Sequence, residues 1–112
     1  MKRIEGYSNR QVRILDAMRL YSGKLRTIEE IMNITGLTNK EKTLMHLLDL
    51  YHRGFITRYT AENADSGEYK VCYVINDAGK AAFDVLFAQY GEELLDECMT
   101  QAEVEDSALV KG

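Results

Sequence analysis

The chain contains no proline and no tryptophan, and only two cysteines, Cys72 and Cys98. These cysteines do not form a Cys-x-x-Cys pair, so the sequence predicts neither a zinc site nor a disulfide framework. No apolar run approaches the roughly 20 residues of a membrane span, and the first residues lack the apolar stretch of a signal peptide. We therefore expect a soluble, cytoplasmic protein with reduced thiols and no membrane contact.

Residue sets typical of enzymes are also missing. The chain has no Gly-x-Ser-x-Gly motif and no phosphate-binding glycine loop. His46 and His52 are six residues apart, whereas two histidines that bind one metal from a helix are four apart. We expect no enzymatic activity and no requirement for a metal, nucleotide or redox cofactor.

The charge of the chain is unevenly distributed. The 112 residues are 46% hydrophobic and 29% charged, which fits one globular domain, and the net charge is −4. Residues 1–60 contain eleven Lys and Arg against six Asp and Glu, whereas residues 61–112 contain three against twelve. Salt confines an electric field to about 10 Å. A local basic surface is therefore compatible with an acidic chain, and so is a polyanionic partner.

The first helix is predicted to begin at Ser8, because Ser8 and Gln11 have the spacing of a capping box. Its apolar side is expected to contain Ile14, Leu15, Met18 and Tyr21. Its charged residues are expected to lie away from this apolar side: Arg10, Arg13, Asp16 and Arg19.

Two further helices follow, joined by a tight turn. Thr27 is the predicted N-cap of the second helix, which ends at Thr35-Gly36. Thr38 and Glu41 repeat the capping-box spacing, so a third helix is expected to begin at Thr38 and to end before Gly54. Its buried side is expected to contain Leu44, Leu47, Leu48 and Tyr51. This arrangement is typical of a helix-turn-helix motif, and it also occurs in αα-hairpins of purely structural proteins.

The second half of the chain predicts a hairpin and a long helix. Residues 55–59 and 69–75 are rich in β-branched and aromatic residues, which favours two strands joined by a long polar tip. One helix is expected over about 78–99, with an apolar stripe formed by Ala82, Phe83, Leu86, Phe87, Tyr90 and Leu94. Residues 100–112 are acidic and have little apolar surface. We therefore expect one domain, residues 1–99, followed by a disordered acidic tail.

Two segments, LYHRGFITR (residues 50–58) and YVINDAGK (residues 73–80), carry a resemblance to a known family. Both resemble segments of winged helix-turn-helix regulators of the MarR and PadR type. LYHRGFITR, residues 50–58, is similar to their L-x-x-x-G-[LF]-I-x-R segment. YVINDAGK, residues 73–80, is similar to their Y-x-L-T-x-x-G-[RK] segment, with Asn76 in place of the usual threonine. The Asp-x-Arg signature of the MarR wing is absent, because Asp65 is followed by Ser66 and Gly67. The resemblance implies an α+β, mostly α, winged helix-turn-helix fold: a three-helix core, a two-stranded wing and a long C-terminal dimerisation helix.

The third helix and the hairpin are the expected DNA-contacting elements. If the leucines of the third helix face inward, its opposite side faces outward with Asn39, Lys40, Lys42, Thr43, His46 and Arg53. Arg58 and Lys70 are expected to contact phosphates from the wing. The tip of the wing contains Glu62, Asp65 and Glu68 and should be repelled by the phosphates. A homodimer interface is expected at Phe83, Phe87, Tyr90 and Leu94.

The predicted function is sequence-specific binding of double-stranded DNA by a small transcriptional regulator. The alternative is a winged-helix protein–protein interaction module that binds a basic partner through its acidic C-terminal half, without DNA contact. The two hypotheses differ in whether the outward side of the third helix is positive.

Overall fold

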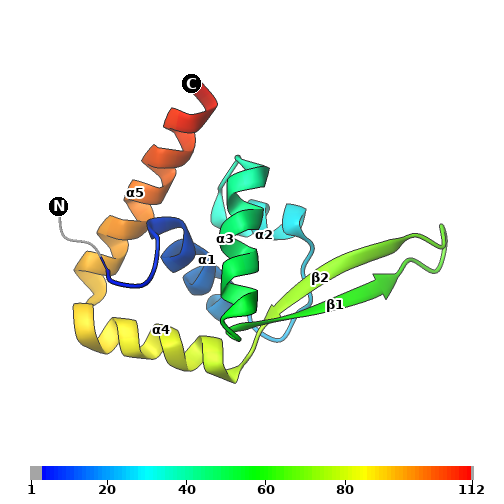
Figure 1. The fold of residues 1–112 in the computed structure, drawn as a ribbon, viewed down its shortest axis with the longest axis horizontal. Coiled ribbons are helices and arrows are strands. Elements are labelled where there is room, and N and C mark those ends of the chain that lie inside the picture. The colour runs from blue at the N-terminus through cyan, green and yellow to red at the C-terminus, as the bar shows by residue number, and fades with distance from the viewer. Residues whose placement is uncertain (1–3, 112) are drawn as a thin grey trace.

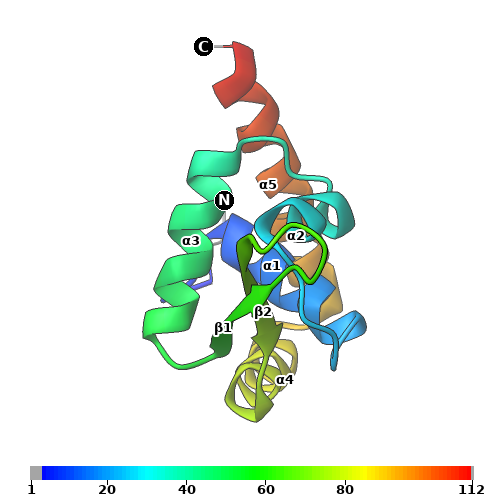
Figure 2. The same ribbon diagram turned by 90° about the vertical axis from the view of Figure 1, so that its right-hand side faces the viewer.

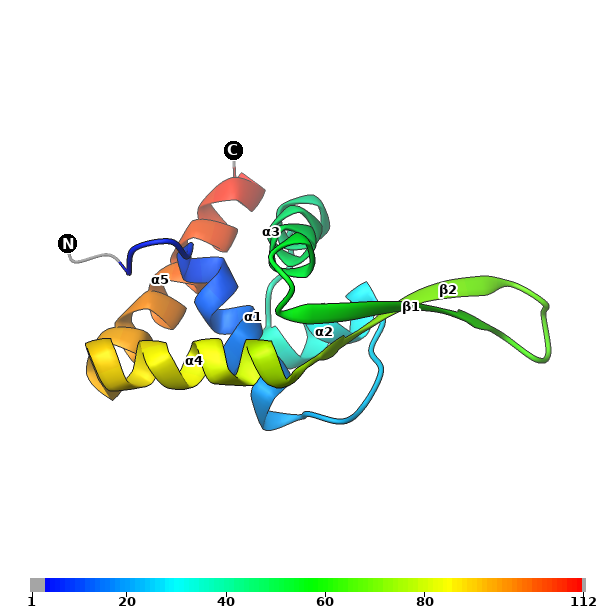
Figure 3. The same cartoon turned by 60° about the horizontal axis from the view of Figure 1, so that its bottom comes forward.

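The computed structural model describes the backbone of residues 4–111 and the side chains of residues 4–107. Over this range the chain is an α+β protein, mostly helical, with five helices and one antiparallel sheet of two strands. The elements are α1 (Asn9–Leu20), α2 (Ile28–Thr35), α3 (Lys40–His52), β1 (Ile56–Glu62), β2 (Tyr69–Ile75), α4 (Asp77–Tyr90) and α5 (Glu92–Lys111). α1 lies in the middle and contacts every other helix, whereas the hairpin projects away from the helical body (Figures 1 and 3).

Local capping signals place the starts of the helices. Ser8 forms the predicted capping box with Gln11, and Thr27 is the N-cap of α2, so these two predictions are confirmed. Thr27 also forms a capping box with Glu30, which was not predicted. The predicted start of α3 is wrong by one residue. Asn39, and not Thr38, is the N-cap, and its side chain accepts a hydrogen bond from the amide of Lys42.

The core forms where α1 meets the other elements. Its buried apolar members from α1 to α3 are Val12, Ile14, Leu15, Met18, Ile31, Leu37, Leu47 and Leu50. The prediction that Arg10 lies away from the apolar side of α1 is wrong, because Arg10 is one turn before Ile14 and is only 3% exposed. α1 is covered on several sides, so its polar N-terminal turn is buried together with its apolar stripe.

The hairpin has a buried base and an exposed outer half. β1 and β2 pair from Ile56↔Ile75 to Glu62↔Tyr69, so β1 extends three residues further toward the tip than predicted. Near the base, Arg26 pairs with Tyr73 through two backbone hydrogen bonds, which link the α1–α2 connection to the sheet.

A glycine allows α4 to begin directly against the base of the hairpin. A Cβ atom on Gly79 would lie 2.2 Å from the carbonyl oxygen of Phe55 and 2.7 Å from the side chain of Ile75. The contact with the carbonyl oxygen is not sterically possible without movement of the backbone. Asn76 is the N-cap of α4, and its side chain accepts a hydrogen bond from the amide of Gly79, which holds this first turn in place.

The C-terminal part of the chain differs from the prediction in two ways. The single helix expected over 78–99 is two helices, because Gly91 adopts φ 84° and ψ 162° and ends α4. The expected disordered tail is also wrong, because α5 continues to Lys111. α5 packs on α1 through a narrow seam that consists of Leu95, Cys98, Ala102 and Asp106. Small and polar residues complete this seam, so the sequence gives no strong apolar periodicity there.

Candidate nucleic-acid interface

One side of α3 is not covered by the rest of the chain. In Figure 2, α3 lies at the edge of the molecule, with α1 and α2 on one side of it only. The exposed residues on this side, which we call the outer face of α3, are Glu41, Lys42, Met45, Asp49 and His52. Met45, in the middle, is 62% exposed. The outer face therefore combines apolar, acidic and basic side chains and is not uniformly positive.

Three of the predicted DNA contacts lie at the N-terminal end of α3. Lys42 is exposed, and its amine makes no ion pair with the residues whose side chains are described. Lys40 is exposed as well, but its amine lies 2.9 Å from the carboxylate of Glu29. Asn39 is half-buried, and its side-chain oxygen is used to cap α3. Lys42 is thus the cation most available to an external anion at this end.

Thr43 is not part of the outer face, so its prediction as a DNA contact is wrong. Thr43 is completely buried, and its hydroxyl accepts a hydrogen bond of 3.1 Å from the guanidinium of Arg10. The fully buried positions of α3 are Thr43, Leu47 and Leu50, whereas Leu44, Leu48 and Tyr51 are half-buried. The helix is therefore rotated toward Thr43 relative to the prediction.

His46 and Arg53 are engaged by the N-terminal segment of the chain. His46 Nδ1 lies 3.1 Å from the hydroxyl oxygen of Ser8. Burial, followed by the nearby charges of Arg10 and Lys42, lowers the pKa of His46 from its usual range. Arg53 donates to the carbonyl of Gly6, and its guanidinium lies 4.4 Å from the centre of the Tyr7 ring.

Arg58 and Lys70 are both exposed on the hairpin, as predicted, but on opposite faces of it. Arg58 pairs with Tyr73 and Lys70 pairs with Ala61. Residues 58 and 61 are an odd number of positions apart, so their side chains point to opposite sides of the sheet. The guanidinium of Arg58 lies over the Tyr51 ring of α3 at 4.7 Å. Arg58 therefore lies on the α3 side of the hairpin.

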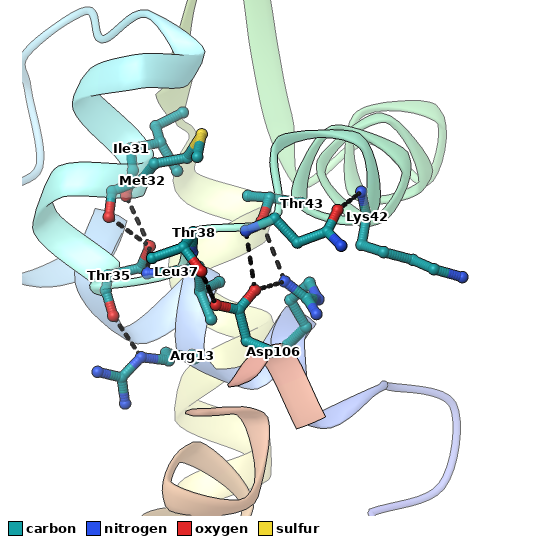
Figure 4. Close-up of polar contacts among 11 residues, drawn as sticks. Arg13, Ile31, Met32, Thr35, Leu37, Thr38, Lys42, Thr43 and Asp106 are labelled. Carbon is teal, nitrogen blue, oxygen red and sulfur yellow. Dashed lines mark hydrogen bonds and ion pairs between the residues drawn. The ribbon is translucent and has the colours of Figure 1, made fainter. Parts of the chain in front are cut away.

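A carboxylate that the sequence did not single out joins α5 to the N-terminal end of α3 (Figure 4). Asp106 is 3% exposed and accepts hydrogen bonds from the Thr38 amide (2.8 Å), the Thr38 hydroxyl (2.6 Å), the Asn39 amide (3.0 Å) and Arg10 Nη1 (2.8 Å). Burial raises the pKa of Asp106, but these hydrogen bonds outweigh burial and hold the pKa well below its usual range. The only sequence signal for burial of Asp106 is that it follows Leu95, Cys98 and Ala102 at intervals of three and four residues, which places all four on one side of a helix.

Most of the aromatic stripe predicted as a dimer interface belongs to the core. Phe83 is 3% exposed and is covered by the guanidinium of Arg19 at 4.4 Å, so its assignment to an interface is wrong. Tyr90 and Leu94 are half-buried against the same core. Phe87 is 48% exposed and is the one member of the predicted set that offers substantial apolar surface.

A cavity of about 520 Å³ lies between α1, α2 and α5. Arg13 lies in its wall and is already bonded to the carbonyls of Thr35 and Met99 and to the carboxylate of Glu103. Among the described residues, no three His, Cys, Asp or Glu side chains are close enough to hold a metal ion. None of the described helices is long and apolar enough to cross a membrane.

Comparisons of the chain with protein-family models, curated proteins and solved structures gave no significant match. Its function is therefore inferred from its residues and their arrangement alone.

Proposed function

We propose that this chain is a winged helix-turn-helix protein that binds double-stranded DNA and acts as a small transcriptional regulator. In this proposal α3 enters the major groove, and the β1–β2 hairpin is a wing that contacts the DNA backbone. The observation that carries the proposal is the uncovered outer face of α3 beside a hairpin that projects from the same body (Figures 1 and 3). A major groove about 12 Å wide admits one helix, and a neighbouring hairpin then reaches the flanking backbone.

The connection between α2 and α3 supports this proposal. Four residues, 36–39, join the two helices, and Gly36 adopts the left-handed conformation that ends α2. Such a short turn containing glycine is typical of helix-turn-helix motifs. The close approach of α4 to Phe55 also gives a physical reason for Gly79, which lies in the segment that resembles MarR and PadR-type regulators.

The proposed contacts fall into two kinds. Lys42, Arg58 and Lys70 are exposed cations and are assigned to phosphates, which position a protein on DNA without reading its sequence. Met45 and His46 are assigned to base edges, where an apolar side chain packs on a thymine methyl group and an imidazole forms a hydrogen bond. Glu41 and Asp49 oppose phosphate contact, so the proposed interface depends on a small number of cations.

A homodimer is part of the proposal. Phe87 is 48% exposed on α4, a helix that packs against the core through Phe83 and Leu86. A two-fold dimer would place two copies of α3 on half-sites about 34–36 Å apart, which is one turn of DNA. The proposed dimer interface therefore contains fewer residues than the predicted aromatic stripe, and we centre it on Phe87.

Selection from random duplexes, followed by titration at several salt concentrations, tests the proposed function. Each phosphate contact contributes about −0.9 to the slope of log K against log salt, so three contacts predict a slope of about −3 per chain. Lys42→Ala should flatten the slope by about 0.9 per chain, or about 1.8 for the proposed dimer, for every sequence. Lys80→Ala, which removes the same charge from α4, is the matched control and should leave the slope unchanged. If no duplex is enriched and binding vanishes at physiological salt, the DNA proposal fails.

A second candidate function uses the acidic surface of α5. Glu93, Asp96 and Glu97 are exposed and form no ion pair with residues whose side chains are described. This cluster favours the alternative of a basic protein partner. It predicts that Glu93→Gln with Glu97→Gln weakens capture of a lysine-rich peptide and leaves duplex binding unchanged, whereas Lys42→Ala has the opposite pattern.

A further inference from the structure

We propose that Asp106 is a positioning residue for α3, through which α5 fixes the N-terminal end of the helix that presents Lys42 and Met45. The nature of the ligand, double-stranded DNA, rests on the proposed function. The link between α5 and α3 rests on contacts within the chain.

The turn before α3 is held from two sides. Asp106, which lies outside the turn, accepts three hydrogen bonds from it, two from Thr38 and one from the Asn39 amide. From inside, the Asn39 side chain accepts the Lys42 amide at 3.0 Å. Figure 4 shows the Lys42 side chain extending away from this network, into the space outside α3. The position of the Lys42 amine therefore depends on a turn whose two amides are bound by a residue 68 and 67 positions later in the chain.

The last turns of α5 are themselves fixed on α1. Glu103 pairs with Arg13, and Glu105 accepts a hydrogen bond of 2.9 Å from the side chain of Asn9. Arg10 lies between these contacts, and its Nη1 bonds both Asp106 and the hydroxyl of Thr43 on α3. α1 and α5 thus form one support, and Asp106 transmits its position to the start of α3.

The Arg10–Asp106 ion pair does more than stabilise the fold. The two side chains are 4% and 5% exposed, and buried ion pairs are often replaced by apolar residues without loss of stability. An apolar residue cannot accept the two amides of the turn, which would then be left without a partner. The same burial excludes direct binding of a DNA phosphate at this site. While α5 is in place, the donors of the turn are occupied and a DNA phosphate has no access to Arg10.

Asp106→Asn and Glu105→Gln form a matched pair of variants for the test. Each removes one negative charge from the same turn of α5, but Glu105 bonds only the side chain of Asn9. At a temperature where both variants are folded by circular dichroism, amide hydrogen exchange at Thr38 and Asn39 should accelerate about tenfold or more in Asp106→Asn and stay near the wild-type rate in Glu105→Gln. Affinity for the selected duplex should fall about tenfold in Asp106→Asn and stay near the wild-type value in Glu105→Gln. Affinity for random duplex should also fall in Asp106→Asn, because Lys42 is assigned to a phosphate.

Several results would overturn the assignment. Equal exchange and equal affinity in the two variants would reduce Asp106 to an ordinary stabilising residue. Tighter binding by Asp106→Asn, with a steeper salt slope, would show that the carboxylate competes with DNA phosphates. If wild-type protein binds no duplex, the proposed function fails, and the exchange rates at Thr38 and Asn39 alone decide whether Asp106 positions α3.

A double variant keeps the test valid if Asp106→Asn does not fold. Arg10→Met with Asp106→Leu removes both buried charges and fills the space with apolar side chains, while the turn still lacks its acceptor. It should fold and show the same accelerated exchange at Thr38 and Asn39. Wild-type exchange and wild-type affinity for the selected duplex in this double variant would contradict the proposal.

Discussion

Nδ1 of His46 lies 3.1 Å from Oγ of Ser8, although the two residues are 38 positions apart. The same oxygen accepts a hydrogen bond from the amide of Gln11 and so caps α1. The start of α1 and a side chain of α3 therefore share one hydroxyl group. This contact keeps His46 half-buried at the edge of the outer face of α3.

His46 gives the stability of the protein a pH dependence. The folded pKa of His46 is lowered from 6.5, chiefly by burial, so the unfolded chain binds more protons than the folded chain as the pH falls below 6.5. The free energy of unfolding should therefore decrease from pH 7.5 to 5.5, with a slope below about 1.4 kcal/mol per pH unit. Urea unfolding measures this change. His46→Gln should remove this contribution and His52→Gln should retain it, so equal curves for the two variants would disprove the assignment.

Truncation of the chain tests whether the second half of α5 stabilises the protein or is dispensable for folding. Ending the chain after residue 99 removes Asp106 with the four hydrogen bonds it accepts, which should cost about 3–5 kcal/mol of unfolding free energy. Ending the chain after Ser107 retains Asp106 and is the control. Thermal melts by circular dichroism compare the two forms, and similar melting temperatures would contradict the role of α5 described above.

Gly79→Ala should destabilise the protein, although alanine favours helices by about 1 kcal/mol over glycine. The added Cβ would approach Phe55 and Ile75 too closely, and the backbone at the base of the hairpin would have to move. We expect a loss of about 2–3 kcal/mol. Ala78→Gly, at the exposed neighbouring position, should cost about 1 kcal/mol through helix propensity alone. A Gly79→Ala variant as stable as wild type would show that α4 can shift freely.

The two phenylalanines of α4 should respond differently to substitution. Phe87→Asp, at the 48% exposed position, should convert the proposed dimer to a monomer without reducing stability. Phe83→Ala, in the core, should cost about 3–5 kcal/mol of unfolding free energy. Analytical ultracentrifugation at micromolar concentration measures the first effect. Val104→Asp, at an exposed position of α5, is the control, and a monomeric wild type would contradict the dimer.

The sequence predicted those elements whose signals are local. Ser8 and Gln11 are three residues apart and need no distant partner, so this capping box was predictable, and so was the N-cap at Thr27. The strands were predictable for the same reason, because their composition is distinctive over a few residues. The ends of β1 and the start of α3 were predicted less exactly, since they depend on strand pairing and on packing against distant segments.

The interface was harder to predict because it depends on contacts between distant segments. Several leucines of α3 allow more than one buried side, and the burial of Thr43 is decided by Arg10, which satisfies its hydroxyl. Asp106 resembles the other acids near the end of the chain and differs from them only in its partners on α1 and before α3. No local pattern contains that information.

The packing of α5 on α1 has a consequence for the biosynthesis of the protein. Residues 9–20 leave the ribosome long before residues 95–106, yet each segment completes the other's buried surface. Contacts of such long sequence separation form slowly, because the intervening chain must first be ordered. During translation the nascent chain therefore carries α1 and α3 without their final support. Exposed apolar surface at this stage favours aggregation or chaperone binding until α5 emerges.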